Sequence, residues 1–571
     1  MRLATALCVA VSLAACTGDH HPVDAHPSTA ALPDDSAGLD PNRTGPAPDI
    51  DGAVSGSVVT IPVPGPGFDT NDPTRTLDPS EVSYVDASGV LSSLITRSLT
   101  QYVWDEDAGG MVLIPDLATD LGTPNADYTE WTFTIRSGVR FEDGTPVTAD
   151  DVAYGIKRSM DKKRLPGAPK WGHEFFLDGH TYKGLYTSGS TYDAIVVDGN
   201  RLTIKMSKPF PDMPYYGTFP EMGPIPETNS DPATYYLHPL ATGPYKVKEF
   251  DPGESLTLVR NEWWDPNTDP GRHQYVDGFD FQFRVKDSAT LDAMIADRGR
   301  ARTSVTLDGL SSELLLPGHT VADRVIAGRT QCTIFMVPDP DKVDEVLVRR
   351  ALGYAWPYQR LWRAIGLIDG LTAYPAATIM PPGTPGRVDY EPLATQPGRT
   401  DPAAALRLLE EAGHERGEYQ IGFAYLRSQP TGTIIANALR RAGFDPAPQP
   451  EPTLHALDAI QHDPNSPLAV TPGGGCADWP SASYWVLADL GGLDPDIDRE
   501  IERVRALPLD EQASAWGALD QTIETDYYPV IPTVNLGVAQ VRGSRIGGLH
   551  FDSVLASPTL KDVYVLPAQE D

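Results

Sequence analysis

The sequence predicts an α/β protein that folds as more than one lobe. Residues 130–161 have the pattern of a strand, a turn and a helix. Trp131 and Phe133 alternate with polar residues, as in a half-buried strand, and Val152 and Ile156 then recur at helical spacing. The chain has 571 residues, which is too long for one ordinary core, so two or three lobes are expected.

The other elements are predicted from the same two periods and from capping residues. Thr148 is an expected N-cap, with Asp151 three residues on in an acidic variant of the capping box. β-branched residues predict a strand over 58–63, and alternation predicts another over 201–206. Residues 166–192 are an expected loop-rich insertion. Apolar stripes and end signals predict helices over residues 88–102, 401–413, 434–443 and 511–525.

The first residues predict export and a lipid anchor. The apolar run 3–14 is too short to span a bilayer permanently, and it ends in Leu-Ala-Ala-Cys16, which resembles the bacterial lipobox. Such a signal, here residues 1–16, is cleaved to leave an acylated Cys16, and two acyl chains give stable anchoring. An ordinary cleavage site with an incidental Cys is the alternative. Residues 17–54 are rich in Pro, Asp and Gly and predict a disordered tether.

The charge balance and the missing motifs exclude several functions. The chain has 45 basic and 78 acidic residues, a net charge of −33, so its field repels nucleic acid and anionic membrane surfaces. An acidic solvated surface is the simplest interpretation, and a cationic ligand is the alternative. The sequence lacks G-x-S-x-G, Walker and H-E-x-x-H motifs, and its histidines lack ligand spacing. It therefore predicts no catalysis, no metal and no cofactor.

The exact residues at positions 135–152 point to a protein family more specifically than the periodicity of this stretch does. It contains Ile135, Arg136, Gly138, Val139, Phe141, Asp143, Gly144, Pro146, Thr148, Ala149, Asp151 and Val152. This pattern resembles the signature of family 5 extracytoplasmic solute-binding proteins of ABC importers, the oligopeptide- and dipeptide-binding group, in an actinobacterial-looking form. Residues 242–247 and the V-R-x-A-L run 348–352 resemble further family elements. Gly243 in the first of these is expected to give the backbone freedom of a tight turn.

The resemblance covers residues 55–571 and implies a class II periplasmic-binding-protein-like fold, α/β, with mixed sheets flanked by helices. It implies two lobes joined by a hinge near residues 330 and 528, plus an extra third domain. An open form would capture an extended solute between the lobes, and a closed form would dock on a permease. The implied boundaries are 55–82, 203–330 and 529–571 for lobe I, 83–202 for domain II and 331–528 for lobe III.

The resemblance also implies ligand contacts in two segments. Residues 76–79 match the family's x-L-D-P element, and in relatives the backbone before this element pairs with an extended ligand. The matching positions are Thr74 and Arg75, although a surface loop is an equal alternative for Arg75. The second segment follows a triple glycine that would let another backbone approach closely. Its expected ligand-binding residues are Gly475, Cys476, Ala477, Asp478 and Trp479.

Two roles in the second segment come from the matching relatives. Asp478 would pair with the free α-ammonium of a peptide, because a buried ammonium needs an opposite charge. The alternative is that Asp478 caps a helix that starts near Ser481. Relatives bond the cysteines that match Cys332 and Cys476, so a disulfide is expected; two free buried thiols are the alternative.

The predicted function is therefore a receptor, with two alternatives. The first hypothesis is a monomeric peptide receptor on the outer face of the cytoplasmic membrane, which delivers short peptides to ABC permease subunits. The second is the same scaffold with a non-peptide solute such as a metal chelate, a sugar or an antibiotic-related molecule. It is kept because peptide binders often have a Trp and an Arg where this chain has Gly475 and Pro472. A secreted enzyme is the remote third hypothesis.

Overall fold

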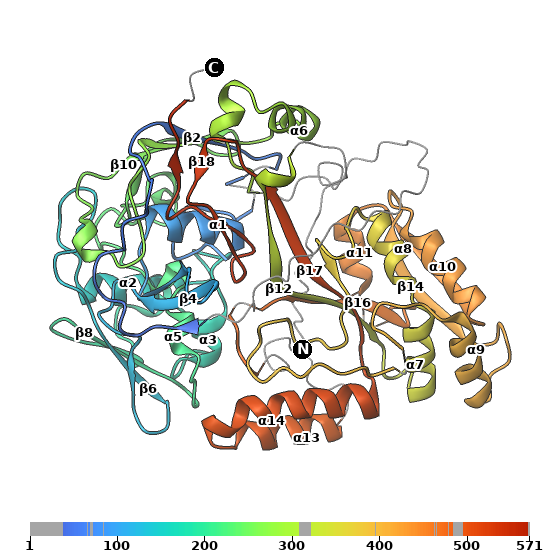
Figure 1. Ribbon diagram of the computed structural model, residues 1–571. Helices are drawn as coiled ribbons and strands as arrows, with labels where there is room; N and C mark the ends of the chain where they lie inside the picture. Colours follow the sequence, from blue (N-terminus) through green and yellow to red (C-terminus); the bar gives the residue numbers. More distant parts are fainter. Residues whose placement is uncertain are drawn as a thin grey trace. The chain divides into compact units, whose positions relative to one another are not determined.

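The computed structural model describes most of the chain, namely residues 38–65, 67–68, 72–83, 85–307, 321–393, 395–461, 463, 465–477, 479–483 and 495–568. Its contacts divide it into a larger unit, Ala37–Ile326 with Ala539–Asp571, and a smaller unit, Ala327–Val538 (Figure 1). The chain passes between the units within β12 (Val325–Pro338) and β17 (Ile531–Val541). The three-domain boundaries expected from the sequence stay a prediction.

A four-stranded mixed sheet forms the first core of the larger unit. Its strand order is β2 (Val58–Pro62), β11 (Gly278–Gln282), β10 (Ser255–Arg260) and β9 (Tyr245–Asp251). β2 pairs in parallel with β11, and the other two pairings are antiparallel. Val59 and Ile61 are fully buried in this core, so the β-branched run at 58–63 forms a strand as predicted.

The signature stretch builds a second four-stranded sheet and the helix that follows it. The order is β5 (Thr123–Pro124), β6 (Glu130–Thr134), β8 (Arg201–Lys205) and β7 (Ile195–Asp198). Trp131 and Phe133 are buried, which confirms the predicted alternation. Helix α2 (Ala149–Ser159) begins with the predicted capping box: the Asp151 N–H donates to the Thr148 hydroxyl, and the Asp151 carboxylate accepts from the Thr148 N–H.

Shorter elements complete the larger unit. The strands are β1 (Gly38–Leu39), β3 (Thr100–Asp105), β4 (Gly110–Pro115), β18 (Ile546–Gly547), β19 (His550–Asp552), β20 (Ser557–Thr559) and β21 (Tyr564–Val565). The helices are α1 (Val85–Val90), α3 (Trp171–Phe175), α4 (Leu185–Ser188), α5 (Met213–Tyr216) and α6 (Asp287–Ala296), with π-helical or 3₁₀ turns at η1 (Leu91–Ile95), η2 (Pro220–Met222), η3 (Tyr235–Leu237), η4 (Pro266–Thr268), η5 (Gly299–Thr303) and η7 (Ala322–Arg324). The expected insertion at 166–192 holds only the short helices α3 and α4.

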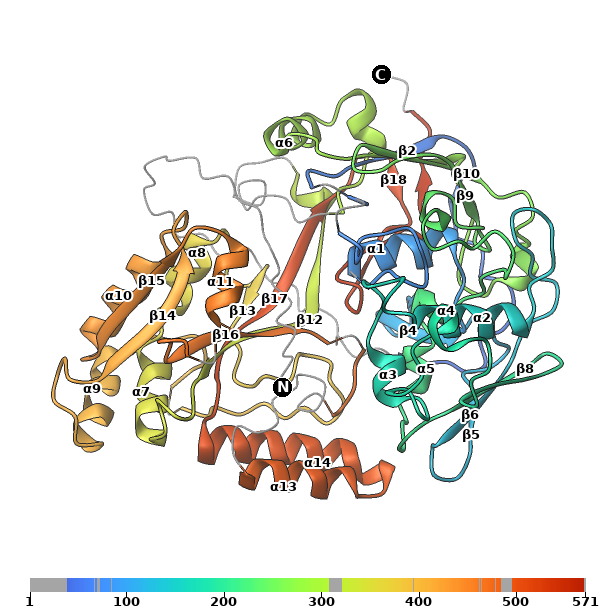
Figure 2. The same cartoon turned by 180° about the vertical axis from the view of Figure 1, so that it is seen from behind.

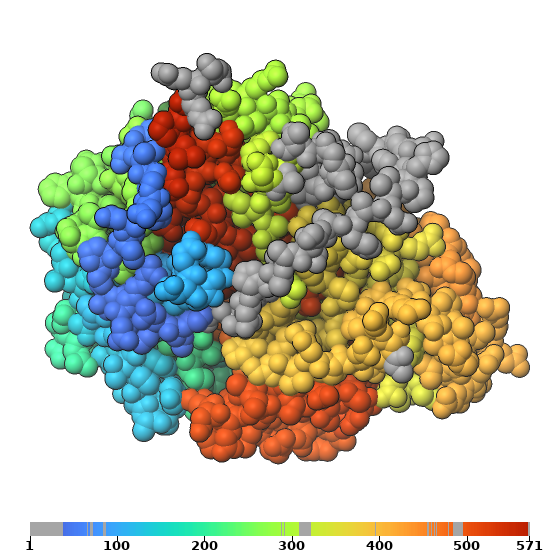
Figure 3. Space-filling model, viewed as in Figure 1, coloured from blue at the N-terminus to red at the C-terminus, as the bar shows by residue number. Residues whose placement is uncertain are grey.

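The smaller unit contains a sheet with strand order β13 (Ala373–Tyr374), β17, β12 and β16 (Val470–Cys476). A parallel pair, β14 (Gln420–Leu426) and β15 (Asp445–Glu451), lies beside α10 (Thr431–Arg441), as the view from behind shows (Figure 2). The other helices are α7 (Val346–Ala355), α8 (Tyr358–Ala364), α9 (Pro402–Glu411), α11 (Leu454–Gln461), α13 (Pro495–Arg505), α14 (Leu509–Thr522) and the π-helical turn η8 (Ile523–Tyr527). α13 and α14 lie at the surface of this unit (Figure 3).

Three expectations about local structure are wrong in detail. The helix expected over 88–102 ends at η1, because residues from Thr100 pair with β4 as strand β3. Gly243 has no positive φ; a Cβ there would lie 2.7 Å from the Leu94 carbonyl oxygen, so the glycine allows a close approach rather than a turn. The helix expected over 511–525 becomes π-helical after Thr522.

Candidate functional site

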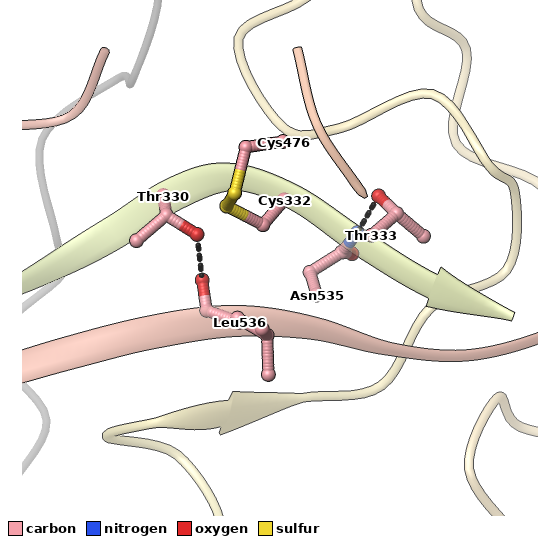
Figure 4. The surroundings of a disulfide bond; sticks show 6 residues. All are labelled: Thr330, Cys332, Thr333, Cys476, Asn535 and Leu536. Atoms are coloured by element: carbon pink, nitrogen blue, oxygen red, sulfur yellow. Dashed lines mark hydrogen bonds between the residues drawn. A yellow bond between two sulfur atoms is a disulfide. The ribbon is translucent and has the colours of Figure 1, made fainter. Parts of the chain in front are cut away.

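The candidate segment of the smaller unit is held to β12 by a disulfide. Cys332 and Cys476 face each other directly in the antiparallel pairing of β12 with β16, and they are bonded, as expected (Figure 4). On the other side of β12, the Thr330 hydroxyl donates to the Leu536 carbonyl at 2.9 Å, and the Asn535 amide donates to the Thr333 hydroxyl at 2.7 Å. The start of the segment therefore has a fixed register against β12.

Two of the three glycines lie close to β12. Gly474 has a φ of 110°, and a Cβ there would lie 2.2 Å from the Thr333 carbonyl oxygen. A Cβ on Gly473 would lie 2.6 Å from the Phe335 ring. The edge of this run that faces β12 is therefore occupied within the protein, and pairing with a ligand stays a prediction for the other edge. The other edge of β16 lies at the end of the sheet's strand order.

The residues after the glycines are only partly described. The Ala477 N–H donates to the Gln331 carbonyl at 2.7 Å, which extends the pairing by one residue. Trp479 is fully buried, so its ring supports the segment by packing. Asp478, the expected partner of a ligand ammonium, lies outside the described residues. Residues 484–494, into which the alternative capped helix starting near Ser481 would extend, also lie outside the described residues.

The candidate segment of the larger unit is a compact turn before the x-L-D-P element. The Asp72 carboxylate accepts from the Thr74 N–H at 3.0 Å and from the Thr74 hydroxyl at 2.6 Å. The Arg75 N–H donates to the Asp72 carbonyl at 3.1 Å, and the Thr74 carbonyl accepts from the Ser83 N–H at 3.1 Å. Thr74 and Arg75 are both half-buried. These bonds fix the backbone of both residues, and Asp72 also engages their side chains.

A buried ion pair holds this turn against the signature helix. Both guanidinium nitrogens of Arg158 in α2 lie 2.6 Å from the Asp78 carboxylate oxygens, and both side chains are fully buried. The Tyr235 ring lies under the guanidinium at 5.2 Å. Burial opposes the charge on Arg158, but Asp78 outweighs it and the pKa of Arg158 rises. Sequence reasoning missed this pair, since eighty positions separate its two residues.

A titratable carboxyl lies behind the same turn. Burial raises the pKa of Glu81 to about 7, although the bond from the Gly167 N–H at 3.4 Å lowers it in part. The Ser83 hydroxyl donates to the Gly167 carbonyl at 2.8 Å. A Cβ on Gly167 would lie 2.4 Å from the Pro73 carbonyl oxygen, so the loop packs directly on the turn. The protonation of Glu81 therefore changes at physiological pH next to the candidate ligand segment.

A second cluster of buried charges consists of two arginines and two aspartates that bind one another. The Arg97 Nε donates to Asp116 at 2.7 Å, and Arg272 donates to Asp116 at 2.9 Å and to Asp269 at 3.2 Å. All four side chains are at most 1% exposed. The opposite charges are therefore paired. Among the described residues no group of three His, Cys, Asp or Glu side chains could hold a metal ion.

Comparison with known proteins identifies the family. The model of bacterial extracellular solute-binding proteins, family 5, matches residues 112–493. The chain belongs to that family. Its members bind solutes extracellularly and are not enzymes, which confirms the prediction of an extracytoplasmic binding protein. Within the part of the chain that the structure describes, no helix is long and apolar enough to cross a membrane.

The curated relatives match part of their length. The chain is 27% identical over 201 residues to the periplasmic murein peptide-binding protein MppA of Escherichia coli (strain K12), covering 34% of this chain and 36% of MppA. It is 25% identical over 346 residues to the glutathione-binding protein GsiB of Salmonella typhimurium (strain LT2), covering 60% of each. The alignments thus span from about a third to three fifths of these relatives.

Solved structures match almost the whole fold. The clavulanic acid biosynthesis oligopeptide binding protein 2 superposes with a TM-score of 0.79 at 23% identity, covering 93% of this chain and 99% of that one. The unliganded open form of the murein tripeptide-binding protein MppA gives a TM-score of 0.67 at 18% identity, covering 90% of this chain and 99% of that one. These likenesses confirm the predicted periplasmic-binding-protein-like α/β fold.

Proposed function

We propose that this protein is a membrane-anchored receptor that captures short peptides outside the cell and delivers them to an ABC permease. The observation that carries the proposal is the family 5 match over residues 112–493, and the similarity to curated peptide-binding relatives supports it. Those relatives include a murein peptide-binding protein and a glutathione-binding protein. The same proposal includes that the protein acts as a monomer. It also includes that its two lobes close on the ligand to capture it.

The ligand would be recognised chiefly through its backbone. β16 ends its sheet, so its outer edge suits an added extended strand, the mode in which main-chain bonds give affinity with little side-chain selection. Thr74 and Arg75 are held by Asp72 in a fixed turn, with both N–H groups bonded to Asp72, and would supply a second ligand contact. Asp478 would pair with the ligand's α-ammonium and select free N-termini.

The deciding experiment begins with native mass spectrometry of the soluble body, residues 54–571, followed by denaturing release of whatever co-purifies. A ladder of short peptide masses is the expected result. The next step compares the Kd of tri-alanine with that of its N-acetylated form by calorimetry, in the wild type and in Asp478→Ala. The matched control is Asp389→Ala, which removes a carboxylate that is 86% exposed in the same unit.

Each result of this comparison decides a specific part of the proposal. N-acetylation should abolish tight binding, and Asp478→Ala should weaken binding of the free amine by more than tenfold while Asp389→Ala changes nothing. Unchanged binding in Asp478→Ala would refute the site. A single non-peptide mass would refute the peptide ligand and favour a non-peptide solute. That alternative agrees with the presence of Pro472 and Gly475 where peptide binders often have an Arg and a Trp.

The lipid anchor on Cys16 has its own test. Acylated Cys16 would place the full-length chain in the membrane fraction, whereas Cys16→Ser would be cleaved elsewhere or left unprocessed. Metabolic labelling with a palmitate analogue should mark the wild type and leave the variant unmarked. Equal labelling of both chains would refute the anchor without affecting the receptor function.

A further inference from the structure

Gln331 is a buried amide without a hydrogen-bond partner beside the candidate segment. It lies in β12 between Thr330 and Cys332, and its residue is 2% exposed. Neither its side-chain oxygen nor its side-chain nitrogen has a hydrogen-bond partner among the described residues. Its main-chain carbonyl accepts from the Ala477 N–H at 2.7 Å, so it is paired with the residue that precedes Asp478.

The neighbouring polar side chains differ from Gln331 because they are satisfied. Thr330, Thr333 and Asn535 each make a hydrogen bond within the sheet (Figure 4). A buried amide that forfeits all its bonds lowers stability, and an apolar side chain of the same length would avoid that cost. Buried polar groups without hydrogen-bond partners are expected where a protein keeps such a group for its function.

We propose that the Gln331 carboxamide is part of the solute-binding site and pairs with a peptide group of the ligand. This inference rests on the proposed function and names a contact for it. A primary carboxamide offers both a donor and an acceptor, which matches the carbonyl and the N–H of a peptide unit. Its position, opposite Ala477 and next to Cys332, puts it beside the segment that carries Asp478.

The test uses Gln331→Met, which keeps the length of the side chain and removes both polar atoms. The proposal expects two opposite effects: a thermal midpoint higher by about 2 °C or more in the ligand-free protein, and a Kd for tri-alanine weakened by about tenfold or more. Asn535→Leu is the matched control, because it removes a buried amide that has a partner in Thr333. That control should lower the midpoint instead.

The outcomes separate this inference from the peptide proposal. If Gln331→Met binds tri-alanine as tightly as the wild type, the carboxamide serves only the fold or an ordered water, and the inference is overturned. If the wild type itself fails to bind tri-alanine and releases no peptide masses, the peptide ligand is refuted. The role of Gln331 is then tested by comparing how much co-purifying solute the wild type and Gln331→Met retain. Equal retention by the two proteins overturns the inference. A wild type that retains no solute overturns both proposals.

Discussion

Replacing Asp78 by Asn should destabilise the larger unit more than any loss of a surface ion pair. The substitution keeps the shape of the side chain and removes its charge. Arg158 would then lie fully buried without an opposite charge. It would keep its bonds to Tyr186 and the Ser230 carbonyl at 3.2 and 3.3 Å and one bond to the amide oxygen of the new side chain. None of these groups carries a charge that offsets the guanidinium.

The size of the effect follows from the burial of both partners. Removing one partner of a buried ion pair costs about 3–5 kcal/mol, because the remaining charge is left in a medium that solvates it poorly. Lys246 and Glu262 provide the matched control: they have the same 2.6 Å separation, but their side chains are 21% and 64% exposed. Glu262→Gln should cost less than about 1 kcal/mol, as solvated pairs do.

Urea unfolding followed by tryptophan fluorescence measures both variants against the wild type. The expected order of unfolding free energy is wild type, then Glu262→Gln slightly below it, then Asp78→Asn well below both. Because Asp78 lies three residues after Arg75, Asp78→Asn should also weaken peptide binding. Equal costs for the two variants would refute the reasoning that burial gives the pair its strength.

Three further predictions concern the same segments. Since the folded pKa of Glu81 is raised from 4.5 to about 7, its stabilising contribution is complete below 4.5 and lost as the pH rises through 7; Glu81→Gln should flatten this decline in urea titrations, and an unchanged slope contradicts it. Replacing Cys332 and Cys476 by Ser opens a loop between positions 144 apart, so the unfolding free energy should fall by about 2–5 kcal/mol, and an unchanged urea midpoint contradicts it. Gly474→Ala should melt below Gly413→Ala, because both glycines have positive φ but only at Gly474 would a Cβ meet backbone; equal melting temperatures contradict it.

Local patterns predicted the elements whose signals lie close together in the chain. Thr148 and Asp151 form the expected capping box, and Asp401 caps α9 by accepting from the N–H groups of Ala403 and Ala404. The same reasoning failed at Thr100, where the apolar spacing continues but cross-strand pairing with β4 decides the structure. A period cannot show which of two structures a distant partner will stabilise.

The partners of the candidate site could not be predicted for the same reason. Nothing near Asp78 in the sequence points to Arg158, and Lys561 donates to Gln101 across 460 positions. The glycine run did indicate a close backbone approach, and at Gly474 the approaching backbone is that of β12. Gln331 is one of several polar residues of β12, beside Arg329, Thr330 and Thr333, and only the structure shows that its amide is unpaired.

The signature helix can act on ligand affinity without touching the ligand. Arg158 belongs to α2 of that signature, and through Asp78 it fixes the turn that carries Thr74 and Arg75. A double variant, Asp78→Leu with Arg158→Met, separates this role from stability. Replacing a buried ion pair by apolar residues is often neutral or stabilising by about 1–4 kcal/mol, so the unfolding free energy should return to that of the wild type or above.

Affinity should not recover with stability in this double variant. Two apolar side chains make no directional bonds to each other, whereas the two-pronged contact of Arg158 with Asp78 fixes their relative position through two hydrogen bonds. Calorimetry with tri-alanine should therefore give a weaker Kd than in the wild type although the protein is equally stable. Recovery of both quantities together would mean that the pair stabilises the larger unit and has no part in positioning the ligand segment.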